Sequence, residues 1–258
     1  MAPRTDESAP GGVQSIARAF YLLELITAAG GELAISELAD RSGLPLPTIH
    51  RIIRTLITSG YVIQQPSRRY ALGPRLIGLG ETASRILGAW VRPRLTDLVE
   101  AVGETANMAI LDGDKAVYIA QVPSRHSMRM FTEVGRRVDL HCTGVGKALL
   151  AQLPPATALE IVRQTGMPAR TEHSITDPDE LMEALARVRE CGYVIDDGEQ
   201  EIGVRCVAVP VPGAPSLTTI SVSGPEARLT PEVVESVVPH LLEAAAGLDR
   251  HFAQSGTR

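Results

Sequence analysis

Four side chains in this sequence could together perform nucleophilic chemistry. Cys142 follows His141 directly, and Asp196 and Cys206 lie further along, in the stretch IDDGEQEIGVRCVAVPVP at residues 195–212. A cysteine activated by a histidine that an acid orients is a hydrolase arrangement. Neighbouring residues of an extended strand point to opposite faces, however, so His141 could not readily activate Cys142 there. The apolar residues after Cys206 would also raise the pKa of its thiol. We therefore expect no catalytic residues and no enzyme.

The same side chains lack the pattern of a metal site. The chain has three cysteines, Cys142, Cys191 and Cys206, and no CxxC pair. A site built from His141, Cys142 and Cys206 would not have the short ligand spacing that zinc sites show. Unpaired cysteines are typical of a protein kept in a reducing compartment. The sequence thus predicts a cytoplasmic protein with no metal and no other cofactor.

A third interpretation makes these residues the walls of a ligand pocket. Ser221 and Ser223 stand two residues apart, so both hydroxyls project from one face of a strand and could donate to the same anion. Asp196 could accept hydrogen bonds from a ligand or from backbone amides, and Cys206 would be a small, soft wall. In CTGVGK, residues 142–147, glycines allow close backbone approach, and the positive end of a following helix would favour a carboxylate. A simply buried Cys206 and a solvated serine face are the alternatives.

Composition indicates a folded protein with one basic segment. The chain has 258 residues, 44% of them hydrophobic, and a net charge of −5, which suits two domains with real cores. The opening MAPRTDESAPGG is typical of a disordered tail and lacks an apolar signal core. No apolar run approaches the roughly 18–20 residues of a membrane helix. Residues 41–75 contain six arginines and no acidic residue, and residues 1–75 carry a net +2 against −7 for the rest. This distribution favours a nucleic-acid patch joined to an acidic remainder.

The basic segment contains a predicted helix-turn-helix. Apolar periodicity predicts helices over residues 15–30, 35–43 and 44–60, with Gly43 in the turn between the last two. Ser15 and Ser36 are the expected N-caps of the first two helices, while Gly30 and Gly60 end the first and third. Pro47 suits a first helical turn. The expected core positions are Ile16, Ala19, Phe20, Leu23 and Ile26 in the first helix and Ile49, Ile52, Ile53, Leu56 and Ile57 in the third.

The third helix would expose a basic face. Thr48, His50, Arg51, Arg54 and Thr58 point away from the apolar stripe, and no acidic residue interrupts them. An arginine there could donate two hydrogen bonds to guanine in the major groove, or bind a phosphate. The alternative is an ordinary solvated helix face.

The segment after this helix favours DNA binding. YVIQQPSRRYALG, residues 61–73, has the pattern of a strand, a turn and a strand, with Arg68 and Arg69 at the turn. A basic two-stranded wing after a third helix makes a winged helix-turn-helix, and wings contact the backbone or the minor groove.

The rest of the chain predicts a linker helix and an α+β domain. Between Pro74 and Pro93 a stripe of Leu76, Leu79, Ala83, Ile86 and Leu87 predicts a helix, either a dimer contact or one packed on its own domain. Strands are then expected over 105–122 around the turn 112–114, and over 127–135, 192–198, 203–211 and 217–225. Helices are expected over 143–153, 177–192 and 230–252. Pro239 is expected to kink or break the last of these helices. This order predicts a largely antiparallel sheet flanked by helices.

Four stretches together resemble the IclR family of bacterial transcriptional regulators. They are ISELADRSGLPLPTIHRIIRTL, HCTGVGKALLA, CGYVIDDGEQEIGVRCVAVPV and ISVSGP, within a likeness over about residues 13–250. The resemblance implies a winged helix-turn-helix domain at 13–73, a linker helix at 74–90 and a GAF-like (profilin-like) effector-binding domain at 91–252. It also implies a ligand pocket whose lining corresponds to Gly144, Val145, Asp196, Cys206, Ser221 and Ser223.

The resemblance further implies that binding to an operator in double-stranded DNA responds to a small-molecule effector, in a homodimer or a dimer of dimers. We expect a repressor that senses a small carboxylate such as glyoxylate or an allantoin-pathway intermediate. Aromatic-acid and acetate-pathway regulators of the family share the pattern, so an activator that senses an aromatic or other carboxylic acid is the alternative. Two further alternatives are a DNA-binding protein whose second domain only oligomerises and a Cys206-dependent hydrolase of small acids.

Overall fold

The computed structural model describes residues 13–88, 90–129 and 132–255, so the predicted tail at 1–12 lies outside the described residues. The chain divides into two compact units, Met1–Ala83 and Ser84–Arg258. Helix α4 (Arg75–Gly88) forms where a helix was predicted between Pro74 and Pro93, and the division falls within it. Its Leu79 is 56% exposed, whereas the side chains at 83–89, and with them the predicted positions Ala83, Ile86 and Leu87, lie outside the described ones.

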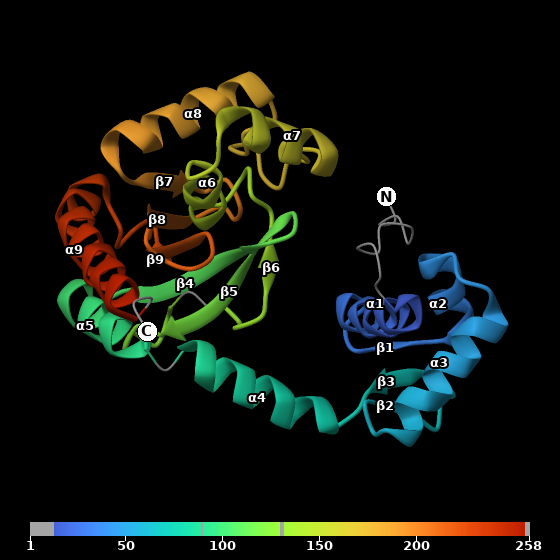
Figure 1. The fold of residues 1–258 in the computed structure, drawn as a ribbon. Helices are drawn as coiled ribbons and strands as arrows, with labels where there is room; N and C mark the ends of the chain where they lie inside the picture. Colours follow the sequence, from blue (N-terminus) through green and yellow to red (C-terminus); the bar gives the residue numbers. More distant parts are fainter. Residues whose placement is uncertain (1–12, 89, 130–131, 256–258) are drawn as a thin grey trace. The chain divides into compact units, whose positions relative to one another are not determined.

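Between residue 13 and the start of α4, the N-terminal unit has three helices and a small antiparallel sheet of order β1-β3-β2 (Figure 1). Gly43 takes the left-handed conformation (φ 66°) in the turn between α2 and α3, a conformation that costs glycine little. The predicted winged helix-turn-helix is therefore confirmed, with β2 and β3 as the wing. The elements are α1 (Gln14–Ala28), β1 (Glu32–Leu33), α2 (Ile35–Ser42), α3 (Leu46–Thr58), β2 (Val62–Gln64) and β3 (Tyr70–Leu72).

The apolar face of α1 differs in part from the predicted one, because Leu23 and Ile26 are buried as predicted but Ile16 and Phe20 are not. Ile16 and Phe20 are 55% and 61% exposed, and the buried positions are Leu22, Leu23 and Ile26. The apolar residues of α1 cover more than one face, and the packing of α2 and α3 selects the face that contains Leu22. In α3, Ile49, Ile52, Ile53 and Leu56 are buried as predicted, whereas Ile57 is exposed at the edge of that face.

The predicted serine caps were wrong. Helix α1 begins after Val13 and α2 after Ala34, so Ser15 and Ser36 lie inside the helices. In α2 the Glu37 carboxylate accepts a hydrogen bond from the Ala34 amide at 2.7 Å and satisfies a free amide of the first turn. A side chain three residues into the helix thus replaces the cap that a serine would supply.

The C-terminal unit is built on a six-stranded antiparallel sheet of order β6-β5-β4-β9-β8-β7. Helices α6, α7 and α8 cover one face, and α5 and α9 cover the other (Figure 1). This arrangement confirms the predicted α+β fold. The elements are α5 (Arg92–Val102), β4 (Thr105–Asp112), β5 (Lys115–Val122), β6 (Arg137–Val138), α6 (Gly144–Leu150), α7 (Pro155–Thr165), α8 (Pro178–Cys191), β7 (Val194–Asp197), β8 (Val204–Pro210), β9 (Thr218–Pro225) and α9 (Pro231–Ser255).

Strand alternation separates an apolar face from a mixed one. Val207, Val209, Ile220 and Val222 pack in the core shared with α5 and α9. The residues between them point to the α6 face, because side chains of a strand alternate. That face carries the cysteine and the serines of the predicted pocket, and Ser221 and Ser223 share it as expected.

One prediction for this unit was wrong, and of the kink or break predicted at Pro239 the break was wrong. Among the described residues of 127–135 no strand forms, and positions 130–131 lie outside them. The segment reaches β5 only at its end, where the Gly135 amide donates to the Tyr118 carbonyl, so the short strand β6 begins at Arg137. Pro239 does not break α9, which is assigned as one helix. None of the helices in the described parts of the chain combines the length and apolarity needed to cross a bilayer.

Candidate functional site

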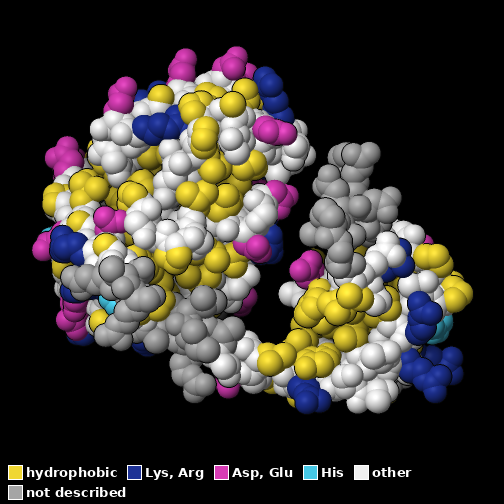
Figure 2. All heavy atoms as spheres, in the orientation of Figure 1, with side chains coloured by type: hydrophobic (Ala, Val, Ile, Leu, Met, Phe, Trp, Pro, Cys, Tyr) yellow, Lys and Arg dark blue, Asp and Glu magenta, His cyan; other side chains and the backbone are white. Residues whose placement is uncertain are grey.

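The outward face of α3 is basic and open to solvent. His50, Arg51 and Arg54 are exposed, Thr48 is half-buried, and no ion pair engages either arginine among the described residues. His50, Arg51 and Arg54 border an open concavity between α3 and Tyr70 of the wing. Figure 2 shows arginine side chains beside a histidine at the edge of this unit. The helix therefore presents donors that no internal acceptor occupies.

The two wing arginines differ in their surroundings. Arg68 is exposed at the turn and has a positive φ of 64°, which is rare outside glycine. Arg69 points inward instead, where its guanidinium pairs with Glu32 at 3.2 Å and with Glu37 at 2.8 Å. Glu37 also caps α2, so Arg69 joins the wing to the start of that helix. Of the two, Arg68 is the residue that the structure leaves free for a partner.

In the C-terminal unit, strand pairing brings three of the predicted pocket residues into one row. Asp196 on β7 lies opposite Cys206 on β8, and Cys206 lies opposite Ser223 on β9. All three are at most 5% exposed. They border a cavity of about 40 Å³ between the sheet and the start of α6. Its lining is Tyr118, Thr132, Arg136, Val138, Thr143, Gly144, Asp196, Gln200, Glu201, Val204, Cys206 and Ser223.

The other predicted pocket residues differ in whether they line this cavity. Gly144 lines it directly. The Val145 side chain is fully buried in the apolar core, so only its backbone amide could serve a ligand. Ser221 is fully buried, two residues along β9 from Ser223, and outside the lining. Helix α6 is only seven residues long, so its dipole contributes less than the sequence suggested.

The absence of a side chain at Gly144 lets α6 approach β8 closely. A Cβ atom there would stand 2.9 Å from Cys206 Sγ. We therefore expect Gly144→Ala to lower the free energy of unfolding by about 1–3 kcal/mol through overpacking. Chemical denaturation should detect the loss, and adding Cys206→Ala should recover most of it because the clashing sulfur is removed. A single variant as stable as the wild type would contradict this account.

Asp196 sits where its charge is unfavourable. Burial and the nearby Glu199 raise the pKa of its carboxyl to about 7, although Lys147 and the backbone amides of Glu199 and Gly144 oppose that change. The Glu199 amide donates to Asp196 Oδ1 at 2.9 Å. At neutral pH the carboxyl is therefore partly protonated, and it can donate as well as accept a hydrogen bond.

A buried ion pair lies next to the residues that line the cavity. Lys147 on α6 is 2% exposed and pairs with Glu199, and its ammonium group also donates to the Ile195 carbonyl at 3.1 Å. Glu199 is itself buried, with only 8% of the residue exposed. Nothing in the sequence pattern joins Lys147 to a residue that lies 52 positions away.

The two buried cysteines are not poised as nucleophiles. Burial and neighbouring carboxylates raise the pKa of both the Cys142 and the Cys206 thiol to about 12. His141 donates from Nε2 to the Pro168 carbonyl at 3.1 Å, whereas Cys142 donates to Gln200 Oε1 at 3.3 Å. A thiol that stays protonated at neutral pH is a poor nucleophile. Both cysteines therefore act as small buried thiols that stay protonated.

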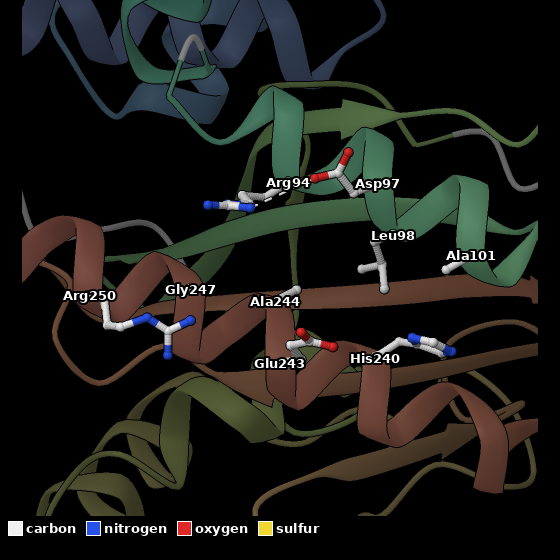
Figure 3. Close-up of a pocket in the computed structure, with 9 residues that line it drawn as sticks. All are labelled: Arg94, Asp97, Leu98, Ala101, His240, Glu243, Ala244, Gly247 and Arg250. Atoms are coloured by element: carbon white, nitrogen blue, oxygen red, sulfur yellow. Dashed lines mark ion pairs between the residues drawn. The ribbon is translucent and has the colours of Figure 1, made fainter.

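A second concavity of about 270 Å³ lies between α5 and α9. Figure 3 shows Arg94 and Asp97 on α5 and Glu243 and Arg250 on α9, with Asp97 directed toward Arg94. Acidic and basic side chains alternate along its exposed rim, and Arg94 already pairs loosely with Asp97 at 3.9 Å. It lacks the buried polar groups of the cavity under α6 and is the weaker candidate for a ligand site.

Comparison with known proteins agrees with both halves of this description. Residues 83–250 match the family model for the bacterial transcriptional regulator IclR C-terminal region, and residues 15–66 match the IclR helix-turn-helix domain. The transcriptional repressor IclR of Escherichia coli (strain K12) is 37% identical over 244 residues, which cover 92% of this chain and 89% of that protein.

Solved structures show the same fold. An IclR transcriptional regulator from Alicyclobacillus acidocaldarius superposes with a TM-score of 0.80 at 32% identity, covering 93% of this chain and 98% of that one. The inducer-binding domain of the PobR transcription factor from Acinetobacter, a double mutant in complex with 3-hydroxybenzoic acid, has a TM-score of 0.58 at 26% identity, covering 63% of this chain and 97% of that one. The chain therefore belongs to the IclR family of bacterial transcriptional regulators.

Proposed function

We propose that this DNA-binding regulator is a repressor whose hold on its operator is changed by a small carboxylate bound in the cavity under α6. Glyoxylate and allantoin-pathway intermediates are the ligands we expect. The observation that carries the proposal is the buried row of Asp196, Cys206 and Ser223 beside that cavity. Repression is supported by the relative in Escherichia coli, which is itself named a repressor.

The size and chemistry of the cavity favour a small anion. Its volume of about 40 Å³ is roughly three times what one water needs, which suits a ligand of a few heavy atoms better than an aromatic ring. The hydroxyls of Ser223 and Thr132 can donate to a carboxylate, and the exposed Arg136 supplies positive charge at the rim. The PobR domain with 3-hydroxybenzoic acid gives the aromatic alternative its support.

On the DNA side we propose that α3 enters the major groove. Thr48, His50, Arg51 and Arg54 would contact base edges and phosphates, and Arg68 would contact the backbone from the wing. Arg69 would act indirectly, by fixing the wing through Glu32 and Glu37. In a homodimer or a dimer of dimers, two such heads would bind the half-sites of a near-palindrome.

A titration of the chain against the DNA upstream of its own gene tests this function. We expect a sequence-specific, salt-sensitive complex at nanomolar protein that glyoxylate weakens. The ligand can shift the equilibrium only by its different affinity for the two states of the protein. The same experiment with 3-hydroxybenzoate tests the aromatic alternative. A complex that no carboxylate changes, together with no ligand-induced rise in the melting temperature, would leave oligomerisation as the role of the second domain.

The protonation of Asp196 predicts a pH dependence of carboxylate binding. Its pKa is raised to about 7 by burial and by Glu199, so the group is neutral below that pH and repels an anion above it. We expect the affinity for glyoxylate to be steady below pH 6 and to fall as the pH rises through 7, by at most about tenfold per pH unit. Calorimetry between pH 5.5 and 8.5 measures this slope. Asp196→Asn should remove it, and equal slopes in both proteins would rule out Asp196 as the titrating group.

A further inference from the structure

Two buried polar groups face each other on the α6 side of the sheet without a hydrogen-bond partner. Among the described residues, Asn107 Nδ2 and Ser221 Oγ are both in this condition. Asn107 on β4 lies directly opposite Ser221 on β9, and neither residue has any solvent exposure. Side chains in such a pair stand about 5 Å apart at Cβ. Buried polar groups are almost always paired, so an unpaired couple calls for a function or a missing partner.

The orientation of the Asn107 amide is fixed from its other side. Gln121 on β5 lies opposite Asn107, and its Nε2 donates to Asn107 Oδ1 at 3.1 Å. Since the carbonyl end of the amide is occupied, the free NH₂ is the end left for another acceptor. Ser221 adds a hydroxyl donor on the neighbouring strand. The two groups therefore present donors side by side, which matches an acceptor oxygen.

This pair lies within reach of the cavity. Ser221 is two residues along β9 from Ser223, which lines the cavity and faces the same side of the sheet. Two residues of a strand span about 7 Å, a distance that a ligand of three or four heavy atoms can bridge. The two serine hydroxyls lie close enough to the Cys206 thiol to lower its pKa against the effect of burial. Sulfur is a weak hydrogen-bonding partner, and Ser221 Oγ has no partner of full hydrogen-bond geometry among the described residues.

We propose that Asn107 is a further effector-contacting residue. Its side-chain NH₂ and the Ser221 hydroxyl donate to one carboxylate or carbonyl oxygen at the inner end of the site, and Gln121 is the residue that positions the amide. The inference rests on the proposed effector function and specifies which oxygen of the ligand the protein recognises. A ligand that places a methyl or an ammonium group there leaves both donors unpaired, so the pair selects for oxygen acids.

Calorimetric titration of the full chain with glyoxylate, and with 3-hydroxybenzoate as a second probe, tests this subsite. Asn107→Ala should raise the Kd of the bound probe about tenfold, the usual cost of one lost buried hydrogen bond. The double variant with Ser221→Ala should lose less than the product of the single losses, because both groups bind one oxygen. Gln121→Ala should raise the Kd less than Asn107→Ala does.

Thr219→Val is the matched control. Thr219 is buried on the same strand and face, but its hydroxyl already donates to the Val209 carbonyl at 2.8 Å, so its removal should leave the Kd unchanged. Probe binding that Asn107→Ala leaves intact while Ser223→Ala weakens it overturns the subsite alone. A wild-type protein that binds neither probe overturns the effector function and the subsite together.

A ligand-free measurement adds an independent test. If the Ser221 hydroxyl is unpaired in the free protein, Ser221→Ala should keep or raise the melting temperature, because an unpaired buried hydroxyl costs stability. A melting temperature below those of the wild type and the Thr219→Val protein would mean that the hydroxyl has a structural partner, and would overturn the subsite.

Discussion

Replacing Arg51 and Arg54 together by alanine is expected to weaken operator binding by about 10²- to 10³-fold. An arginine that contacts guanine or phosphate contributes roughly 1–3 kcal/mol to a specific complex, and α3 exposes both side chains with no internal ion pair among the described residues. Fluorescence anisotropy with the operator at one fixed salt concentration measures the change. The melting temperature should stay the same, because neither side chain packs in the core.

The matched control removes the same charge from the other unit. Arg163 on α7 and Arg187 on α8 are also exposed, so a double alanine variant there lowers the net charge equally. It should change operator affinity by less than about threefold, since only long-range, salt-screened attraction is lost. Equal losses in the two double variants would mean that net charge, and no contact from α3, governs binding.

The winged helix was predictable because its signals are local. Helical periodicity, Gly43 and the Pro-Ser turn each act within a few residues of chain, and all three agree. The predictions fail where a segment far away in the sequence determines which side chains are buried or paired. Ile16 and Phe20 stay exposed because α2 and α3 pack on another face of α1. Arg69 turns inward because Glu32 and Glu37, more than thirty residues earlier, are placed beside it.

The lining of the cavity could likewise be predicted only in part from the sequence. Asp196, Cys206 and Ser223 could be grouped by family resemblance, and the pairing of β7, β8 and β9 then sets them in a row. Tyr118 enters the lining from β5, near the other edge of the sheet, and Arg136 enters it just after residues 127–135, where the predicted strand does not form. Their contribution follows from the path of the chain between β5 and β6, and periodicity carries no information about that path.

Replacing Lys147 by methionine is expected to lower the free energy of unfolding by about 3–5 kcal/mol. The substitution leaves Glu199 buried without its cation, and an uncompensated buried charge is costly. Glu199 Oε2 already lacks a hydrogen-bond partner among the described residues, so little else is available to stabilise its charge. Urea denaturation at pH 7.5 measures the loss. The deficit should shrink at lower pH, because burial raises the pKa of Glu199 and protonation removes the unpaired charge.

Two further variants separate the lost charge from lost packing. Lys147→Met combined with Glu199→Leu should recover most of the stability, because apolar replacement of a whole buried pair is often neutral. Lys115→Met is the control for an ion pair that can lose one member. Lys115 is 31% exposed, and its partner Asp139 keeps a second contact with Arg170, so the cost should stay below about 1 kcal/mol. The Lys147 variant also affects the proposed effector site, because Glu199 adjoins Gln200 and Glu201 in the cavity lining. If the double variant folds stably but binds glyoxylate poorly, the ion pair positions residues 199–201 for the ligand. If the double variant is no more stable than Lys147→Met alone, the stability comes from the packing of the lysine side chain and not from its charge.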